Sequence, residues 1–473
     1  MGGSLLTGLH IALSGLEAQQ SVIAVTAHNI ANAATPGYSR QVADLAPNPP
    51  YSPPSLDQGN GPQQFGMGVT VAQVKRQSSQ FLSLQLWDTQ TQVGASAQQS
   101  TTLGQVQAML NEPSNTGLNT AFDAFWNSWQ NLSNDAQSAA ARSQVVAAGQ
   151  ALATQVQTVS GQISGMQASL DASVGQTITQ VNELTSQIAG LNQEIAAATA
   201  AGQNPNDLAD TRDRLIGQLA GLAPVGVTWQ KDGEADVAVG TVQVVAGPSS
   251  IQLLGTPDPS NNNFLKLTWT QVGIPASIGG GSLGALINLR DQIVPGYLAK
   301  LNTLVAGVAT KVNTQHELGY DATGVSDATV PFFGTGGAVT AANIAVNPAL
   351  TANPNLLAAA STATAGPGDG SNAVAIADLQ NARFLGAGTQ TPSDAYASLV
   401  GGVGSDAAAA DSAQANQQVL QNSIQSQQQQ VSGVALDEEM TTMVEAQNAY
   451  AAAAKVSSTI DTMLGDLIGM VQP

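Results

Sequence analysis

Acidic side chains form three clusters whose chemistry would be hydrolysis. Paired carboxylates catalyse glycoside hydrolysis when a cleft raises the pKa of one of them. We interpret these clusters instead as solvated charges or helix caps, because acidic groups favour a helix start and exposed helix faces. No catalytic residue is therefore predicted, and the chain is not expected to be an enzyme. The clusters are Asp437, Glu438 and Glu439; Asp210 and Asp213; and Asp232, Glu234 and Asp236.

The histidines and one glycine-rich segment are the candidates for metal or cofactor binding. His10 and His28 lie about 27 Å apart on one predicted helix, too far to share an ion. His316 has no third ligand at a usable spacing. Residues 279–284, GGGSLG, fit a dinucleotide fingerprint, but the surrounding strands look antiparallel and Leu304 stands where an acid is needed. We predict no metal and no cofactor, and interpret the glycines as a flexible return to helix.

Composition excludes several partners. The chain has 473 residues, enough for about two to four domains, and a net charge of −19 with only 13 Lys and Arg. A nucleic-acid or anionic membrane surface needs a basic face, so neither nucleic-acid binding nor membrane insertion is expected. There is no cysteine, and no basic segment precedes an apolar block at the N-terminus. We expect a soluble chain exported without a cleaved signal peptide.

Both ends of the chain carry apolar residues at three- and four-residue steps, the pattern of a narrow helical stripe. Glycines interrupt the N-terminal stripe, and each costs about 1 kcal/mol relative to alanine. Such helices are marginal alone in water, so we expect coiled-coil-like helices that need a partner. This predicted assembly stripe comprises Leu6, Leu9, Leu13, Leu16, Ile23, Ile30, Leu436, Met440, Met443, Tyr450, Val456, Ile460, Met463 and Leu467.

The middle of the chain predicts long helices with one β insertion. Prolines between positions 47 and 54 exclude helix, residues 61–74 indicate a loop followed by a strand, and helix resumes near Ser79. No proline occurs between Pro113 and Pro205, which favours one or two very long helices. Later segments predict a period-two β unit, a helix over about 283–317 and a last long helix over about 393–431.

The expected fold class is therefore mainly α with a β insertion (α+β), made of terminal coiled-coil helices, a long-helix bundle body and a small antiparallel β unit. We predict three parts. Residues 1–35 with 434–473 form a terminal helical assembly domain. Residues 36–225 with 282–433 form the bundle body, in which 322–392 is mixed. Residues 226–281 form the inserted β domain.

The segment at 28–41, HNIANAATPGYSRQ, is the most informative stretch. Pro36 and Gly37 occupy the second and third positions of a turn, the pattern of a type II turn. Pro36 also prevents the preceding helix from continuing. From the residues alone this is a helix end followed by a turn.

A helix that ends in this motif resembles the axial proteins of the bacterial flagellum, which form the rod, the hook and the hook-associated layers. Residues 14–41, SGLEAQQSVIAVTAHNIANAATPGYSRQ, are most similar to the hook-associated protein 1 family. Residues 432–464, 206–220 and 289–321 are similar to the same family. The resemblance covers most of the chain and is weakest at 226–280 and 322–395. Its turn motif comprises Asn29, Asn32, Thr35, Pro36, Gly37 and Tyr38.

The resemblance implies a structural component of the extracellular flagellum that forms the junction zone between hook and filament. The implied partners are further copies of the chain in a helical layer, the hook protein, hook-associated protein 3, and an export chaperone at the C-terminal helix. The implied route is the flagellar type III export apparatus. We expect the two ends to pair antiparallel and to fold fully only among neighbouring subunits. The alternatives are another axial protein, from the hook or distal rod, and more remotely a wall hydrolase.

Overall fold

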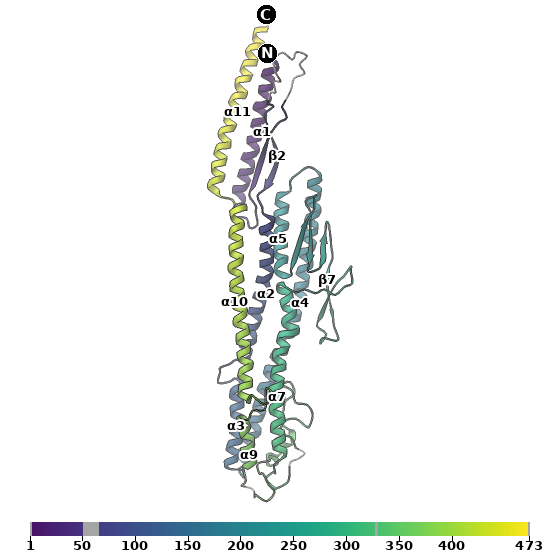
Figure 1. The fold of residues 1–473 in the computed structure, drawn as a ribbon, viewed down its shortest axis with the longest axis vertical. Helices are drawn as coiled ribbons and strands as arrows, with labels where there is room; N and C mark the ends of the chain where they lie inside the picture. Colours follow the sequence, from purple (N-terminus) through teal and green to yellow (C-terminus); the bar gives the residue numbers. More distant parts are fainter. Residues whose placement is uncertain (1, 51–65, 327–329, 367, 472–473) are drawn as a thin grey trace.

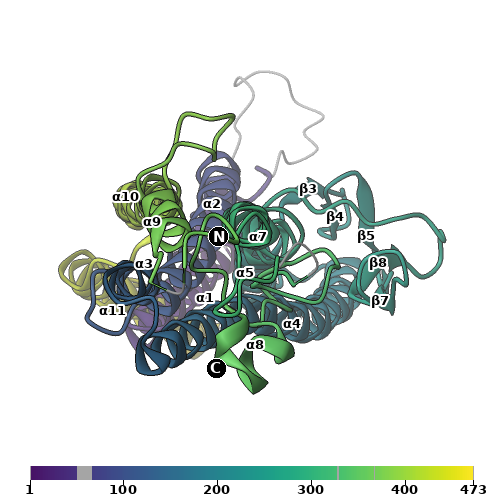
Figure 2. The same ribbon diagram turned by 90° about the horizontal axis from the view of Figure 1, so that it is seen from below.

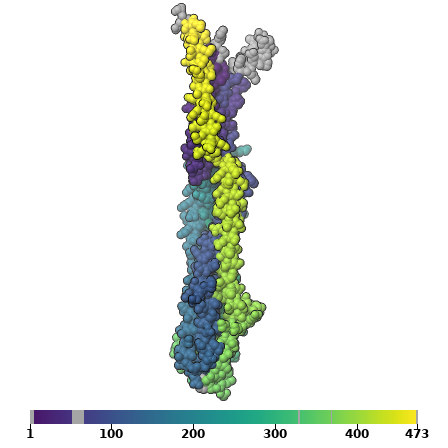
Figure 3. Space-filling model, turned by 90° about the vertical axis from the view of Figure 1, so that its left-hand side faces the viewer, coloured from purple at the N-terminus to yellow at the C-terminus, as the bar shows by residue number. Residues whose placement is uncertain are grey.

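The apolar periodicities of the sequence fold into long helices that lie side by side along one axis (Figure 1). The structure, a computed structural model, describes residues 2–50, 66–326, 330–366 and 368–471. The terminal helices form one end of an elongated molecule, and a longer helical body forms the rest (Figure 3). The fold is mainly α with small antiparallel sheets, as predicted.

The terminal end consists of two helices and a hairpin. Helices α1 (Gly2–Asn32) and α11 (Leu436–Val471) pack against each other and run in opposite directions (Figure 1). Strands β1 (Gln41–Pro47) and β2 (Val69–Arg76) form an antiparallel hairpin along α1. The strand β2 was predicted, whereas β1 was not.

The predicted domain division assigned residues 36–76 to the body. Because the hairpin packs along α1, we propose that it belongs with the terminal helices. The predicted loop before β2 falls largely on residues 51–65, which include Pro53 and Pro54 and lie outside the described residues.

The body is a bundle of helices whose starts are set by local caps. Ser79 and Ser138 accept hydrogen bonds from the first turns of α2 and α4, and Thr391 and Asp394 form a capping box at α10. Helix α10 runs along α2, and α4 contacts α3, α5 and α7. The helices are α2 (Gln80–Leu110), α3 (Leu118–Asn134), α4 (Ala139–Ala200), α5 (Asn206–Leu222), α6 (Gly281–Asn288), a π-helical turn (Leu289–Ile293), α7 (Val294–Glu317) and α10 (Pro392–Ser432).

Three predictions are confirmed: a helix that begins near Ser79, a helical segment over 283–317 and a long helix over 393–431. The segment over 283–317 contains a π-helical turn. The region predicted as mixed contains short helical pieces and isolated β-bridges among the residues described there. The helical pieces are α8 (Pro348–Ala352), α9 (Ser371–Ala377) and two 3₁₀ turns (Pro354–Leu356 and Asp378–Gln380).

The β insertion lies beside α4 and projects from one side of the body (Figure 2). Four strands form an antiparallel meander in the order β3-β4-β5-β6, and β7 pairs with β8. The glycine-rich segment after it leads back to helix, as predicted, because α6 begins at Gly281. Gly281 itself is packed tightly, since a Cβ on it would overlap the backbone of Leu222, whereas one on Gly279 would meet no neighbouring atom. The strands are β3 (Val225–Trp229), β4 (Ala235–Val239), β5 (Val242–Ala246), β6 (Ser249–Ser250), β7 (Leu253–Pro257) and β8 (Leu265–Trp269).

The hydrophobic core is continuous through the body and stops before the terminal helices. Its described members extend along the sequence from Trp87 to Ala410. Phe125, Trp129 and Phe332 form an aromatic cluster at the end of the body far from the termini. Within the described ranges, no residue of α1 or α11 belongs to this core. The body thus has a core of its own, and the terminal pair does not share it.

Candidate assembly interface and the polar joint at its base

Small side chains form the seam between α1 and α11. A Cβ built on Gly8 would lie 3.2 Å from Ile460 Cδ1, and one on Gly15 would lie 3.7 Å from Ala453 Cβ. Ala12 is buried in α1. Glycine allows backbones to approach closely, so the residues that weaken the isolated helix are the ones that bring it against its partner. From the sequence these glycines were interpreted only as a cost to the helix.

Leu6 and Leu13 of the predicted N-terminal stripe do not face α11. At about 100° per residue, Leu6 and Leu13 lie about 160° around α1 from Gly8 and Gly15. Leu6 is 54% exposed and Leu13 is 43% exposed. The remaining residues of this stripe are partly buried: Leu9, Leu16, Ile23 and Ile30. Leu6 and Leu13 therefore present an apolar surface away from the seam.

The predicted C-terminal stripe is divided between the seam and the outside. Ile460 contacts Gly8 of α1, and Met443 and Leu467 are partly buried. The other predicted residues are exposed: Leu436, Met440, Tyr450, Val456 and Met463. Further apolar residues are exposed on the same two helices: Ile11, Val444, Ile468 and Met470. We call the exposed apolar residues of α1 and α11, which are distributed around both helices, the outer face.

Asn29 is the centre of the turn motif. Its Oδ1 accepts hydrogen bonds from Tyr38 Oη at 2.7 Å and Gln41 N at 2.9 Å. Its Nδ2 donates to Gln41 O at 2.8 Å and to Glu439 Oε2 at 2.9 Å. The amide thus makes four hydrogen bonds, the full complement of its two donors and two acceptor lone pairs. One buried side chain joins α1, the turn, β1 and α11.

The predicted turn is present and orients Tyr38. Tyr38 N donates to Thr35 O at 3.2 Å, and Gly37 has a positive φ of 82°, as a type II turn requires. Thr35 Oγ1 donates to Asn32 Oδ1, and Pro36 is exposed. Burial, assisted by the charges of Asp207, Asp210 and Glu439, raises the pKa of Tyr38. The hydroxyl therefore remains a proton donor to Asn29.

The C-terminal acidic cluster lies in the first turn of α11, as expected of solvated charges or helix caps, but Glu439 is an exception. Its side chain is only 2% exposed and accepts from Arg40 Nε at 2.6 Å as well as from Asn29. Glu438, the preceding residue, is 68% exposed and lies 3.7 Å from the same arginine. Arg40 N also donates to Ser432 O at the end of α10. These contacts tie Glu439 to the turn after α1. We call the polar contacts made by Asn29, Tyr38, Ser39, Arg40, Gln41, Arg76, Asp210 and Glu439 the joint.

Asp210 corrects the same interpretation for the second cluster. It is buried, accepts from Ser39 N at 2.7 Å and Ser39 Oγ at 2.8 Å, and pairs with Arg76 at 2.9 Å. Burial raises the pKa of Asp210, and the bonds from Ser39 and Arg76 oppose that effect. Arg76 also pairs with Asp213 at 2.8 Å. The turn after α1 is thereby fixed to the face of α5.

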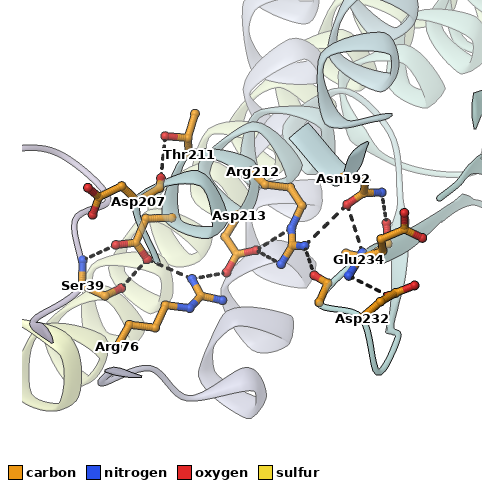
Figure 4. A network of polar contacts seen from close by, with 12 residues as sticks. Ser39, Arg76, Asn192, Asp207, Thr211, Arg212, Asp213, Asp232 and Glu234 are labelled. Carbon is orange, nitrogen blue, oxygen red and sulfur yellow. Dashed lines mark hydrogen bonds and ion pairs between the residues drawn. The ribbon is translucent and has the colours of Figure 1, made fainter. Parts of the chain in front are cut away.

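The network continues from this joint into the β insertion (Figure 4). Asp213 pairs with Arg212, whose Nη1 donates to Gly233 O at 2.6 Å. Asn192 of α4 bonds the backbone of Ala235. The third acidic cluster, Asp232, Glu234 and Asp236, lies in the hairpin formed by β3 and β4, as expected. A chain of polar contacts therefore links the turn motif to the side of the body.

The three histidines lie in separate surroundings. His10 is exposed, and His28 lies 3.3 Å from Asp207 beside the ring of Tyr38. His316 is fully buried, with Nδ1 2.9 Å from Val330 O, and Nε2 accepts from Ala358 N. Within residues 2–50, 66–326, 330–366 and 368–471, no three potential metal ligands gather. No helix in those ranges is long and apolar enough to span a bilayer.

Sequence reasoning missed Ser39, Gln41, Arg76, Asp210 and Glu439 as parts of this joint. Ser39 and Gln41 directly follow the turn motif, and that adjacency was the available signal. No comparable signal marks Glu439 and Asp210, because their partners Asn29 and Ser39 lie more than a hundred residues away in the sequence.

Family models match three parts of the chain. "Flagellar hook-associated protein FlgK helical domain" matches residues 103–333. "Flagella basal body rod protein" matches residues 9–38, and "Flagellar basal body rod FlgEFG protein C-terminal" matches residues 425–470. The matches at the two ends fall on the paired helices, and the match in the middle falls on the body.

Whole-length relatives and one solved structure agree with these models. Flagellar hook-associated protein 1 of Bacillus subtilis is 30% identical over 503 residues, covering 98% of this chain and 98% of that protein. The Escherichia coli protein of the same name is 28% identical over 550 residues, covering 97% and 98%. The flagellar hook junction protein FlgK from Burkholderia pseudomallei has a similar fold, with a TM-score of 0.64 at 21% identity, over 74% of this chain and 100% of that one.

These relatives, the turn motif at the end of α1 and the antiparallel terminal pair lead to one conclusion. The chain belongs to the flagellar hook-associated protein 1 family.

Proposed function

We propose that this protein is a non-catalytic structural component of the bacterial flagellum and forms the junction between hook and filament. The names of its relatives and of the hook junction protein with a similar fold support this role. The observation that carries the proposal is the outer face: Met440 at 60% exposed and Leu6 at 54% exposed lie on helices outside the hydrophobic core. An extended apolar surface on a protein marks a site for association.

Assembly would complete the burial that the single chain lacks. Burying each Leu, Ile or Met side chain of the outer face contributes about 1.5–3 kcal/mol, which offsets the entropy lost when a helix is ordered. We propose that the terminal helices fold fully only when neighbouring subunits cover this face. Contacts between different surfaces of successive subunits generate a helical layer.

The proposed partners follow from the family. We infer that further copies of the chain, the hook protein and hook-associated protein 3 are its neighbours in the flagellum. We also infer that a chaperone covers the C-terminal helix before export through the flagellar export apparatus. The exposed apolar residues of α11, which a chaperone would shield, support this last inference.

Gene deletion tests the role of the protein. Deletion in the native bacterium should give cells that have hooks and release flagellin but carry no filaments. Cells without hooks would contradict the junction role and favour a hook or distal rod protein.

Complementation tests the outer face itself. Leu6→Glu with Leu13→Glu places charges on the outer face at α1, away from the helix that the chaperone would cover, and we expect this variant to be exported but to restore few filaments. Val272→Glu, at a residue 50% exposed in the loop after β8, is the matched control and should restore filaments. Equal restoration by both variants would show that the outer face is not an assembly surface.

A further inference from the structure

We infer that Asn29, Glu439 and Arg40, here called the register lock, set the register in which α11 pairs with α1. The inference goes beyond the proposed function and does not depend on it, because it concerns pairing within one chain. It rests on the hydrogen bonds of these residues and on the composition of the seam that they adjoin.

The seam by itself permits more than one register. Further along the helices from the register lock, each described contact places a glycine of α1 against an apolar residue of α11: Gly8 faces Ile460, and Gly15 faces Ala453. Ala446, which is buried, lies one heptad below Ala453. If α11 shifted by seven residues, Ala446 would therefore take the place of Ala453 opposite Gly15. Small apolar seams of this kind tolerate a slip of one heptad unless a polar residue forbids it.

The register lock forbids that slip because its polar atoms are satisfied in only one arrangement. Glu439 lies at the same heptad position as Ala446, Ala453 and Ile460, and it is the charged residue buried at that position. Its two oxygens accept from Asn29 and Arg40. Asn29 in turn has no free donor or acceptor, since its other bonds go to Tyr38 and Gln41. A shift of α11 by one heptad would separate Glu439 from Asn29 and Arg40, leaving a buried carboxylate and one donor of Asn29 unpaired.

The short connection between α10 and α11 is the competing explanation for the register. Three residues, 433–435, join Ser432 to Leu436. A connection of this length resists a shift, but unwinding about five or six helical residues, roughly one and a half turns, would supply the missing length of about 10 Å. The experiment must therefore separate the effect of the side chains from the effect of the connection.

Disulfide trapping measures the register directly, because the natural chain has no cysteine. The full chain carries Gly15→Cys, Ala453→Cys and Ala446→Cys together. The Cβ separation of 3.7 Å at positions 15 and 453 suits a disulfide. Positions 446 and 453 lie about 10 Å apart on one helix and cannot be bridged. Under mild oxidation of dilute protein, peptide mapping then gives the ratio of the 15–453 bond to the shifted 15–446 bond.

The 15–453 bond should predominate in the chain with an intact lock. Glu439→Leu should lower the ratio of native to shifted bond at least about tenfold, as expected when a buried charge no longer opposes the slip. Glu438→Leu, at the exposed neighbour, is the matched control and should leave the ratio unchanged. An unchanged ratio in Glu439→Leu would overturn the inference and assign the register to the connection.

A second variant covers the case in which Glu439→Leu prevents pairing and yields neither bond. Glu439→Gln keeps the shape of the side chain and an oxygen that accepts from Arg40 Nε. Its amide NH₂ group, however, cannot accept the hydrogen bond that Asn29 Nδ2 donates to Glu439. The ratio should fall by less than in the leucine variant. A ratio equal to that of the intact chain would overturn the inference, as would covalent dimers as the main product with Glu439 intact. Because the readout is a bond within one chain, filament counts play no part in it.

Discussion

Asn29 and Glu439 are separated by 410 residues, and their side chains meet in a hydrogen bond of 2.9 Å at the base of the terminal helix pair. One belongs to the turn motif at the end of α1, and the other belongs to the first turns of α11. The two ends of the chain therefore form one unit, joined where that unit meets the body.

Asn29→Ala should weaken this unit. The substitution leaves Glu439 and the backbone N–H and C=O of Gln41 each short of one partner, and each such buried group costs about 1–3 kcal/mol. We expect a large loss of filaments in a deletion strain complemented with this variant, at equal secreted amounts. Asn32→Ala is the control, because Asn32 bonds only the less buried His28 and Thr35. Equal filament counts for the two variants would contradict the role given to Asn29.

A small and a large side chain at position 15 should change the stability of the α1–α11 pair in opposite directions. Gly15→Ala places a Cβ at an ordinary contact distance of 3.7 Å from Ala453 and raises helix propensity, so it should stabilise α1 by about 1 kcal/mol. Gly15→Leu has no space in the seam and should abolish pairing. Slower amide hydrogen exchange in α1 for the alanine variant, and faster exchange for the leucine variant, would support the seam.

The control for this pair is Gly190→Leu on α4, where an added Cβ meets no neighbouring atom. It should leave the exchange of α1 unchanged. If Gly15→Leu behaves like Gly190→Leu, the seam is misplaced.

Asp210→Ala should release the turn motif from the body. Ser39 loses its acceptor, and Arg76 keeps only Asp213; breaking a buried pair typically costs about 3–5 kcal/mol. Hydrogen exchange of residues 36–41 should accelerate. Asp207→Ala removes a carboxylate that is 61% exposed, and it should have the smaller effect. A larger effect for Asp207 would show that the joint depends on the exposed contact.

Much of the fold follows from the sequence, because long helices carry a strong periodic signal. The stretch without proline between Pro113 and Pro205 contains α4, which spans Ala139–Ala200, and the period-two segment contains the antiparallel strands. The strand β1 was not predicted, since QVADLAP is short and ends in proline. A segment too short to show a periodic pattern was thus not predicted.

The joint was harder to predict than the helices. A carboxylate in a sequence carries no mark of burial, and Glu439 differs from Glu438 only through its partners on a distant segment. The place of the α1 glycines in the seam was missed for the same reason, because it depends on Ile460 and Ala453 of the other helix. The stripes identified apolar residues correctly, but a single helix does not reveal which of its sides meets a partner.

The stability of the body should fall below about pH 6.5 because of His316. Burial lowers the pKa of His316 from 6.5 to about 4, although its bond to Val330 O opposes the shift. The folded protein therefore binds fewer protons than the unfolded chain between these values. The stability that the neutral imidazole provides is complete above about pH 6.5 and is lost as the pH falls towards 4, a change of about 3 kcal/mol.

Denaturant unfolding at several pH values measures this loss, and Trp129, whose ring centroid is 6.2 Å from that of His316, supplies a fluorescence signal. His316→Gln should remove the dependence over this pH range. His10→Gln, at an exposed histidine, should retain it. A pH dependence that survives in His316→Gln would assign it to other groups.

The central claim is that the terminal helices complete their folding only among neighbouring subunits. Limited proteolysis of the free chain and of flagella that contain it tests this claim most directly. We predict rapid removal of about 30–40 residues from each end of the free chain, because helices without full partners are cleaved first, and protection of the same segments in the flagellum. Terminal helices that resist cleavage equally in the free chain would contradict the claim.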